Sequence, residues 1–253
     1  MAKAERNDGM TSIGGHVIKA AIVFVAVAVY AAAPAGVQAD GNAEMKERMV
    51  SASNGSSAAT QNVGQQPAKT ARVLLPGPDE MTPAQREAYE KDPLARTNLT
   101  RLFNLAPSMA PGLRDMNMGM ATGITLPPEE REIVAYAVLN LERGEWELAQ
   151  HREVVKMMGI APAKVDAIVR EHYGDPAFTD RERALLAFTR QVVKTVRVDD
   201  PTFAAVAAFY DRRQIVETLL VIGNYMMLAR ISEATELPVE SSVGASFWKN
   251  QAK

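Results

Sequence analysis

The chain has 253 residues, of which 47% are hydrophobic and 23% charged, and its formal net charge is -2. This composition is typical of a globular protein with one sizeable core, and the intermixed charges leave no cationic surface of the kind that nucleic acids select. The absence of cysteine excludes a thiolate nucleophile, a disulfide framework, an iron-sulfur cluster and a cysteine-ligated zinc site.

The N-terminal segment 1–39 has the features of a secretory signal peptide. Basic residues come first, an apolar run follows over 20–33, and Val37-Gln38-Ala39 supplies a cleavage site. The run is shorter than the roughly 20 residues that span a bilayer, which favours cleavage over retention as an anchor. Retention and a start at Met10 are the alternatives. We therefore expect an exported protein, periplasmic or secreted, with no stable membrane span after cleavage.

Segment 40–75 is rich in Ser, Asn, Gln, Gly and Ala and has few large apolar residues. Such a segment buries too little surface to offset its chain entropy. The sequence therefore predicts a flexible linker over 40–75, a helical domain over 76–240 and a C-terminal tail over 241–253.

Within the domain, apolar residues recur at helical spacing between prolines, glycines and capping residues. No alternating segment is long enough to predict a strand, so we expect an all-α fold. The expected helices are a short one opening at Pro83, 98–105, 111–121, a largely buried one ending after Leu141, one from Glu145 through Met158, a short one opening at Pro162, 181–196, one opening at Asp200-Pro201, and a long apolar one over 214–234.

The candidate catalytic residues are His151, Glu147 and Glu132. Glu147 and His151 stand four residues apart, on one face of a helix, so the carboxylate can orient or charge the imidazole. Glu132 belongs to the preceding helix, and a break at Gly144 can fold that helix back beside the first. A histidine between two carboxylates can move protons near neutral pH. The same spacing also occurs in structural or solvated pairs, so this alternative stays open.

At these residues the chain resembles the carboxymuconolactone decarboxylase-like family, which includes the alkyl hydroperoxidase D-type proteins. The resemblance covers about 97–238 and rests on three segments: Leu126-Pro127-Pro128-Glu129-Glu130-Arg131-Glu132-Ile133-Val134, Gly144-Glu145-Trp146-Glu147-Leu148-Ala149-Gln150-His151 and, in support, Asn224-Tyr225-Met226-Met227-Leu228-Ala229-Arg230. It implies an all-α fold of helical hairpins, assembly into trimers, hexamers or related rings, and a pocket close to a subunit interface.

In the redox branch of that family, a glutamate precedes a Cys-x-x-Cys pair and a histidine. Glu132 and His151 stand at the places of that glutamate and histidine, whereas Gly144 and Glu147 replace the two cysteines. Because a dithiol cycle needs a thiolate and a resolving thiol, the resemblance points to the decarboxylase-like branch. There, His151 is implied to protonate carbon as carbon dioxide leaves.

Arg131, Trp146 and Glu145 are further candidates for substrate binding. An arginine such as Arg131 or Arg152 can hold a substrate carboxylate, although either can equally form a surface ion pair. Trp146 and Glu145 precede Glu147 on its helix; for Trp146 the alternative role is as a packing or interface anchor. The methionines of 116–120 are interpreted as adaptable packing or as the lining of an apolar pocket.

The sequence thus predicts a lyase or isomerase that acts by acid/base chemistry on a small carboxylated or lactone substrate. We expect no cofactor, no bound metal and no nucleic-acid partner. We expect a homo-oligomer, either a trimer or a hexamer. One alternative is a non-catalytic helical oligomer or binding module. Another is an antioxidant protein that reduces peroxide without the cysteine pair, which would require a bound metal or haem.

Overall fold

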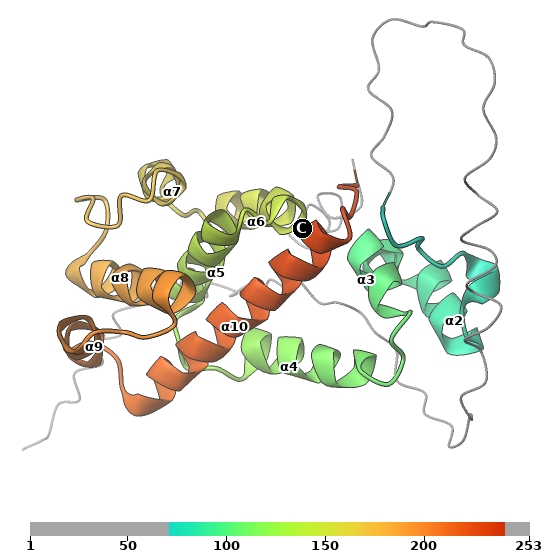
Figure 1. The fold of residues 1–253 in the computed structure, drawn as a ribbon, viewed down its shortest axis with the longest axis horizontal. Coiled ribbons are helices and arrows are strands. Elements are labelled where there is room, and N and C mark those ends of the chain that lie inside the picture. Colours follow the sequence, from blue (N-terminus) through green and yellow to red (C-terminus); the bar gives the residue numbers. More distant parts are fainter. Residues whose placement is uncertain (1–70, 241–253) are drawn as a thin grey trace, which may run out of the picture.

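The computed structural model describes residues 71–240, so the expected signal peptide, most of the expected linker and the C-terminal tail lie outside the described residues. Within 71–240 every regular element is helical, as expected (Figure 1). The elements are η1 (Pro78–Glu80), α2 (Pro83–Lys91), η2 (Pro93–Arg96), α3 (Asn98–Phe103), α4 (Ala110–Thr122), α5 (Pro128–Glu142), α6 (Glu145–Met157), α7 (Pro162–Val169), α8 (Asp180–Thr195), α9 (Asp200–Ala207) and α10 (Arg212–Ala234).

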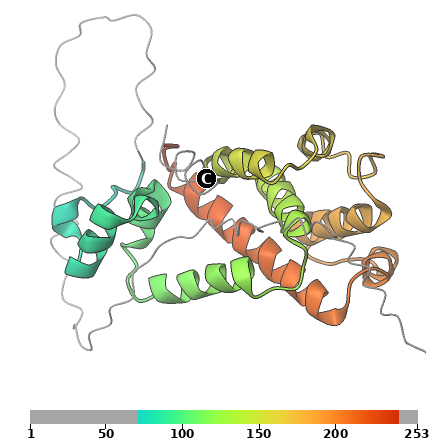
Figure 2. The same ribbon diagram turned by 180° about the vertical axis from the view of Figure 1, so that it is seen from behind.

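Helix α10 runs through the middle of the molecule. It contacts α5, α6, α8 and α9, with α2 and α3 at one end of the molecule and α7 to α9 at the other (Figures 1 and 2). By length and composition α10 is also apolar enough to cross a membrane, and half of its most apolar stretch is buried inside the protein. A central core helix has the same composition as a membrane span, because both are apolar around most of their circumference.

Helices α5 and α6 form the hairpin that the sequence predicted. Helix α5 is buried over most of its length. Its C-cap residue, Arg143, adopts the left-handed conformation (φ 58°, ψ 39°), which ends the helix. Gly144 follows directly as the N-cap of α6. This two-residue corner turns the chain back so that the inner faces of the two helices meet.

The observed helix ends differ from the expected ends where side chains cap the backbone. Helix α10 begins at Arg212 rather than at residue 214, because Asp211 accepts a hydrogen bond from the Gln214 N–H while the Gln214 side chain accepts one from the Asp211 N–H. Helix α3 ends at Phe103, two residues earlier than expected. Short 3-10 turns at η1 and η2 were not expected.

The chain already contacts the domain at the end of the expected linker. The Arg72 N–H donates to the Thr235 carbonyl at 2.8 Å, and the Arg72 guanidinium lies 2.6 Å from the Glu236 carboxylate. Residues 71–75 therefore lie beside the end of α10.

Candidate active site

A buried carboxylate fixes the start of α5, the helix that carries Glu132 and Arg131. Glu217 on α10 accepts hydrogen bonds from the Thr125 N–H at 2.7 Å, the Thr125 hydroxyl at 2.9 Å and the Leu126 N–H at 3.1 Å. These hydrogen bonds hold the segment before the N1 proline of α5 against α10. The register of α5 relative to α10 is thereby set from one end.

His151 and Glu132 form a buried pair between α6 and α5. The Nδ1 atom of His151 lies 2.6 Å from Oε1 of Glu132, and their side chains are 1% and 4% exposed. Burial alone lowers the pKa of His151, but the attraction and the hydrogen bond from Glu132, with a smaller contribution from Glu147, outweigh it, so the pKa is raised above the ordinary value. Glu132 therefore favours the protonated imidazole, in which Nδ1–H donates to the carboxylate.

The second ring nitrogen of His151, Nε2, differs from Nδ1 in its surroundings. Nε2 is buried and has no hydrogen bond within the described residues. The ring of Tyr225 on α10 stands edge-on to the imidazole, with centroids 5.0 Å apart and an interplanar angle of 86°. Glu132 thus fixes the ring through Nδ1, and Nε2 remains as the atom that can exchange a proton.

Glu147 lies one helical turn before His151, as the spacing predicted, but it does not hydrogen-bond to the imidazole. Its side chain is 0% exposed, and neither carboxylate oxygen has a partner within the described part of the chain. Burial raises the pKa of Glu147 to about 7; nearby His151 opposes this rise and Glu240 adds to it. A buried carboxyl without partners is costly when ionised, so Glu147 holds a proton over much of the pH range below neutrality.

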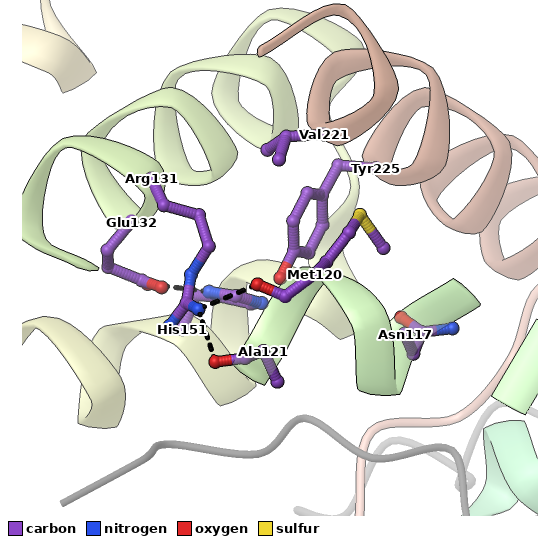
Figure 3. Close-up of a pocket in the computed structure, with 8 residues that line it drawn as sticks. All are labelled: Asn117, Met120, Ala121, Arg131, Glu132, His151, Val221 and Tyr225. Atoms are coloured by element: carbon purple, nitrogen blue, oxygen red, sulfur yellow. Dashed lines mark hydrogen bonds and ion pairs between the residues drawn. The ribbon is translucent and has the colours of Figure 1, made fainter. Parts of the chain in front are cut away.

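A small cavity of about 20 Å³ lies beside His151, and residues of four helices form its walls (Figure 3). A volume of this size accommodates about one water molecule. Helix α4 supplies one wall, and α5, α6 and α10 supply the others; the lining residues are Asn117, Met120, Ala121, Arg131, Glu132, His151, Val221 and Tyr225.

Arg131 lies in this cavity with its charge unopposed by a protein carboxylate. Its Nη1 donates to the main-chain carbonyls of Met120 at 2.9 Å and Ala121 at 3.2 Å (Figure 3). No carboxylate of residues 71–240 lies within ion-pair distance of its guanidinium. A half-buried guanidinium with free donors is a suitable partner for an anionic group.

Trp146 and Glu145 lie away from the cavity. Trp146 is 3% exposed in the apolar cluster between α3 and α10, and its Nε1 donates to Glu240 at 2.7 Å. Glu145 has an exposed side chain, and its N–H donates to the Glu233 carboxylate at 2.7 Å. Arg152 is exposed as well. The structure therefore brings His151, Glu132 and Arg131 to the cavity, places Glu147 beside them, and leaves the other candidates outside.

The sequence interpretation missed the contribution of α4 and α10 to the cavity. Tyr225 belongs to a segment that supported the resemblance but was not assigned to the site. Met120 belongs to the methionine-rich stretch, for which the lining of an apolar pocket was one of two interpretations. Asn117 is a further lining residue, and its Oδ1 accepts a hydrogen bond from Nδ2 of Asn224 at 3.3 Å. Within residues 71–240, no three His, Asp or Glu side chains are grouped so that they could hold a metal ion.

Gly144 stands at a close contact between α6 and α10. A Cβ atom at this position would lie 2.8 Å from Cβ and 3.3 Å from Cα of Ala229. These distances are shorter than an ordinary carbon contact of about 3.5–4.0 Å. Glycine is therefore required here by the approach of the two helices, and any side chain at residue 144 would have to push them apart.

Comparison with known proteins identifies the architecture. No protein-family model and no curated protein matches the sequence, but several solved structures match the fold. An uncharacterized peroxidase-related protein from a Silicibacter species has a TM-score of 0.61 at 18% identity, covering 70% of this chain and 96% of its own. The alkylhydroperoxidase AhpD core protein from Ralstonia eutropha, also peroxidase-related, has a TM-score of 0.59 at 15% identity, covering 70% and 97%. The debrominase Bmp8 has a TM-score of 0.50 at 16% identity, covering 62% and 82%. At these identities, the likeness is one of fold.

Proposed function

We propose that this chain, which has the alkyl hydroperoxidase D-like helical fold expected from its sequence, is an enzyme that works by acid/base chemistry. The proposed reaction is that of a cofactor-independent lyase or isomerase on a small carboxylated or lactone substrate. One observation carries the proposal: a fully buried histidine, bound through Nδ1 to Glu132, lines a cavity beside an arginine that has no acidic partner among residues 71–240. Geometry of this kind is what proton transfer to a bound substrate requires.

His151 is suited to act as an acid. In a decarboxylation, the bond from carbon to the carboxylate breaks, carbon dioxide leaves, and the electron pair remains on the carbon and its conjugated carbonyl group. The imidazolium Nε2–H then gives its proton to that carbon, and solvent returns a proton to the imidazole. Glu132 raises the pKa of His151 and so favours the imidazolium that this step requires. In an isomerisation, the neutral fraction would accept a proton at one carbon and return it at another.

Arg131 is suited to hold a carboxylate beside that proton. It is half-buried at the cavity, and among residues 71–240 it has no acidic partner. An anionic substrate would therefore be drawn to the cavity without displacing an existing ion pair. A guanidinium also binds a carboxylate through two parallel hydrogen bonds, which orients the substrate as well as attracting it.

Dithiol peroxide reduction, the chemistry of the redox branch, is not open to this chain. It contains no cysteine, and the resemblance places Gly144 and Glu147 where the thiols would stand. The close contact between Gly144 and Ala229 also leaves no room for a thiol at the first of these positions. The peroxidase-related and debrominase neighbours therefore support the scaffold but not the reaction.

The second hypothesis, a non-catalytic binding or structural module, predicts that His151 and Glu147 are open to solvent. Both residues are instead 0% exposed. Maintaining two buried titratable groups without full hydrogen bonding destabilises a protein, and a purely structural module has no need of them. Their burial supports the enzyme.

We also propose that the chain forms a homo-oligomer, a trimer or a hexamer. The supporting observation is an apolar stripe on the outside of α10, where Val216, Leu219 and Leu220 are 55%, 41% and 53% exposed. These residues share one helical face. Sedimentation of the protein and of the Leu220→Asp variant tests this proposal: the wild type should sediment as an oligomer and the variant as a smaller species.

Export is proposed for the same chain on the basis of segment 1–39. Expression of the complete sequence in a bacterium, followed by N-terminal sequencing of periplasmic material, should show a chain beginning at Asp40. A cytoplasmic chain that begins at Met1 or Met10 would contradict this proposal.

The enzymatic proposal is tested with a panel of small carboxylic acids and γ-lactones in D₂O. Proton NMR should show deuterium entering carbon positions, or loss of the carboxyl group, with the wild type. His151→Ala should abolish turnover, and His151→Gln, which keeps a polar partner for Glu132, should do the same while retaining the circular dichroism spectrum. His172→Ala, at an exposed histidine, should react like the wild type. Undiminished turnover in both His151 variants would end the proposal.

A further inference from the structure

The cavity beside His151 is too small for the substrate class that its residues suit. At about 20 Å³ it accommodates one water molecule, whereas a carboxylate group alone has three heavy atoms. Ligand sites that enclose small organic molecules usually measure about 300–1,000 Å³. At least one wall of the cavity must therefore move before any organic molecule reaches the histidine.

Helix α4 is the wall with the weakest attachment to the core. It supplies Asn117, Met120 and Ala121 to the cavity. Among those of its side chains that the structure describes, only Ala110 and Met120 are buried apolar groups, whereas α5 is buried along most of its length. Its N-cap makes no side-chain hydrogen bond. Segments with few buried contacts open at a small fraction of the free energy of global unfolding.

Besides the apolar packing of Met120, arginine side chains bind the carbonyl groups at the C-terminal end of α4. Arg131 donates from α5 to the carbonyls of Met120 and Ala121, and Arg213 on α10 donates to the carbonyl of Gly123 at 2.8 Å. The last carbonyls of a helix have no partner within the helix, and a guanidinium that binds them is a strong but reversible tie. Of these two arginines, Arg131 is the one that lines the cavity itself.

We propose that α4 is a gate over the cavity beside His151 and that Arg131 is its latch. When Arg131 binds the two carbonyls, α4 is closed and the cavity holds only water. When these hydrogen bonds break, the end of α4 that carries Asn117 and Met120 moves away, and the face of α10 that carries Val221 and Tyr225 becomes accessible. This proposal concerns access to the cavity, so it stands or falls independently of the reaction catalysed there.

The absence of cysteine makes the gate directly measurable, because a single introduced thiol has no background. Val221→Cys places a thiol at a cavity residue that is 0% exposed. Val155→Cys is the matched control: it is 5% exposed and belongs to an apolar cluster that contains no residue of α4. The probe is the thiol reagent DTNB under native conditions. The Val221→Cys thiol should react at least ten times faster than the control thiol, since gate opening is cheaper than unfolding.

The latch is tested by adding Arg131→Met to each reporter. Loss of hydrogen bonds from a charged donor should speed the reaction of the Val221→Cys thiol by roughly tenfold or more. Arg131→Lys, which keeps one charged donor, should give an intermediate rate. Arg152→Met, which removes an exposed arginine, should leave the rate unchanged.

Two results would overturn the proposal. Equal rates for the Val221→Cys and Val155→Cys thiols would mean that the cavity opens only when the protein unfolds. An equal acceleration of both reporters by Arg131→Met would mean that the arginine supports the whole fold rather than the gate. Acceleration confined to the Val221→Cys reporter supports both parts of the proposal.

Discussion

Replacing Gly144 by alanine should destabilise the protein, although alanine is a better residue for most helices. The added Cβ would lie 2.8 Å from Cβ of Ala229 and 3.5 Å from Cδ2 of Leu139, so α6 and α10 must separate by on the order of 1 Å to restore ordinary contacts. Overpacking of this kind costs roughly 1–3 kcal/mol. Any residue can adopt the backbone conformation of Gly144 (φ -75°, ψ 86°). The lower entropy of the unfolded alanine variant therefore offsets about 0.4–1 kcal/mol of the overpacking cost.

The expected net loss for Gly144→Ala is therefore about 0.5–2 kcal/mol, by the difference of these two contributions. Urea unfolding followed by circular dichroism measures it. Ala229→Gly alone should lose about 1 kcal/mol of helix propensity, but in the Gly144→Ala background it removes the clash. The double variant should thus be more stable than the sum of the single effects by at least about 0.5 kcal/mol. Gly223→Ala is the control, because a Cβ there meets nothing within 4 Å. Additive effects at 144 and 229, or a Gly144→Ala variant as stable as the wild type, would refute the reasoning.

Three further predictions concern Glu147, the Glu132–His151 pair and the backbone at Val196. Because the pKa of Glu147 rises from 4.5 to about 7 on folding, its contribution to stability is fully present below pH 4.5 and is lost as pH rises to about 7. This loss is on the order of 3 kcal/mol. Urea midpoints should therefore fall from pH 4.5 to 7.5 in the wild type. Glu147→Gln should abolish this fall, and an unchanged fall in the variant would contradict the prediction. Glu132→Gln should lower the pKa of the His151 imidazole, since Glu132 is its main stabilising partner; an NMR titration that shows no decrease would count against the buried pair. Val196 has φ 64° and ψ -42° and is 84% exposed, a strained γ-turn conformation for a β-branched residue. Val196→Gly should therefore raise the free energy of unfolding by about 1 kcal/mol, and a lower urea midpoint would contradict this.

The fold could be predicted because residues close in sequence set many of its helix boundaries. Thr82 and Thr179 each accept a hydrogen bond from the N–H three residues on, and each is followed by a Gln or Glu that completes a capping box. Such signals depend on a few neighbouring residues, so a single sequence displays them. The start of α10 was placed two residues late because the box of Asp211 and Gln214 was not recognised.

The convergence of Glu132 and His151 was predictable for a similar reason, since a helical hairpin with a two-residue corner leaves few ways to pair the inner faces. Helical spacing could also have set Glu145 aside. A helix that turns Glu147 and His151 inward places a residue two positions earlier on the opposite side, and the Glu145 side chain is exposed.

The remaining walls of the cavity could not be predicted from periodicity. Asn117 and Tyr225 meet there from helices separated by about a hundred residues, and each is a polar residue within an otherwise unremarkable helical pattern. Which polar residue faces a cavity depends on how α4 and α10 are rotated about their axes. That rotation is set by the packing of side chains across three helices, a non-local property that one sequence does not display.

The groups around the cavity suit the proposed reaction, which exchanges protons without net oxidation. Reduction of a peroxide takes two electrons from the protein, and a thiol pair supplies them because a disulfide can be reduced again. The imidazole, carboxylates and guanidinium of the cavity have no such couple, and the thioether of Met120, once oxidised, needs a separate reductase for its repair. Where the resemblance implies a thiol, the chain instead buries the carboxyl of Glu147, whose proton is exchangeable near neutral pH. Under the proposed function, the Glu132–His151 pair transfers protons, which suits a lyase or an isomerase.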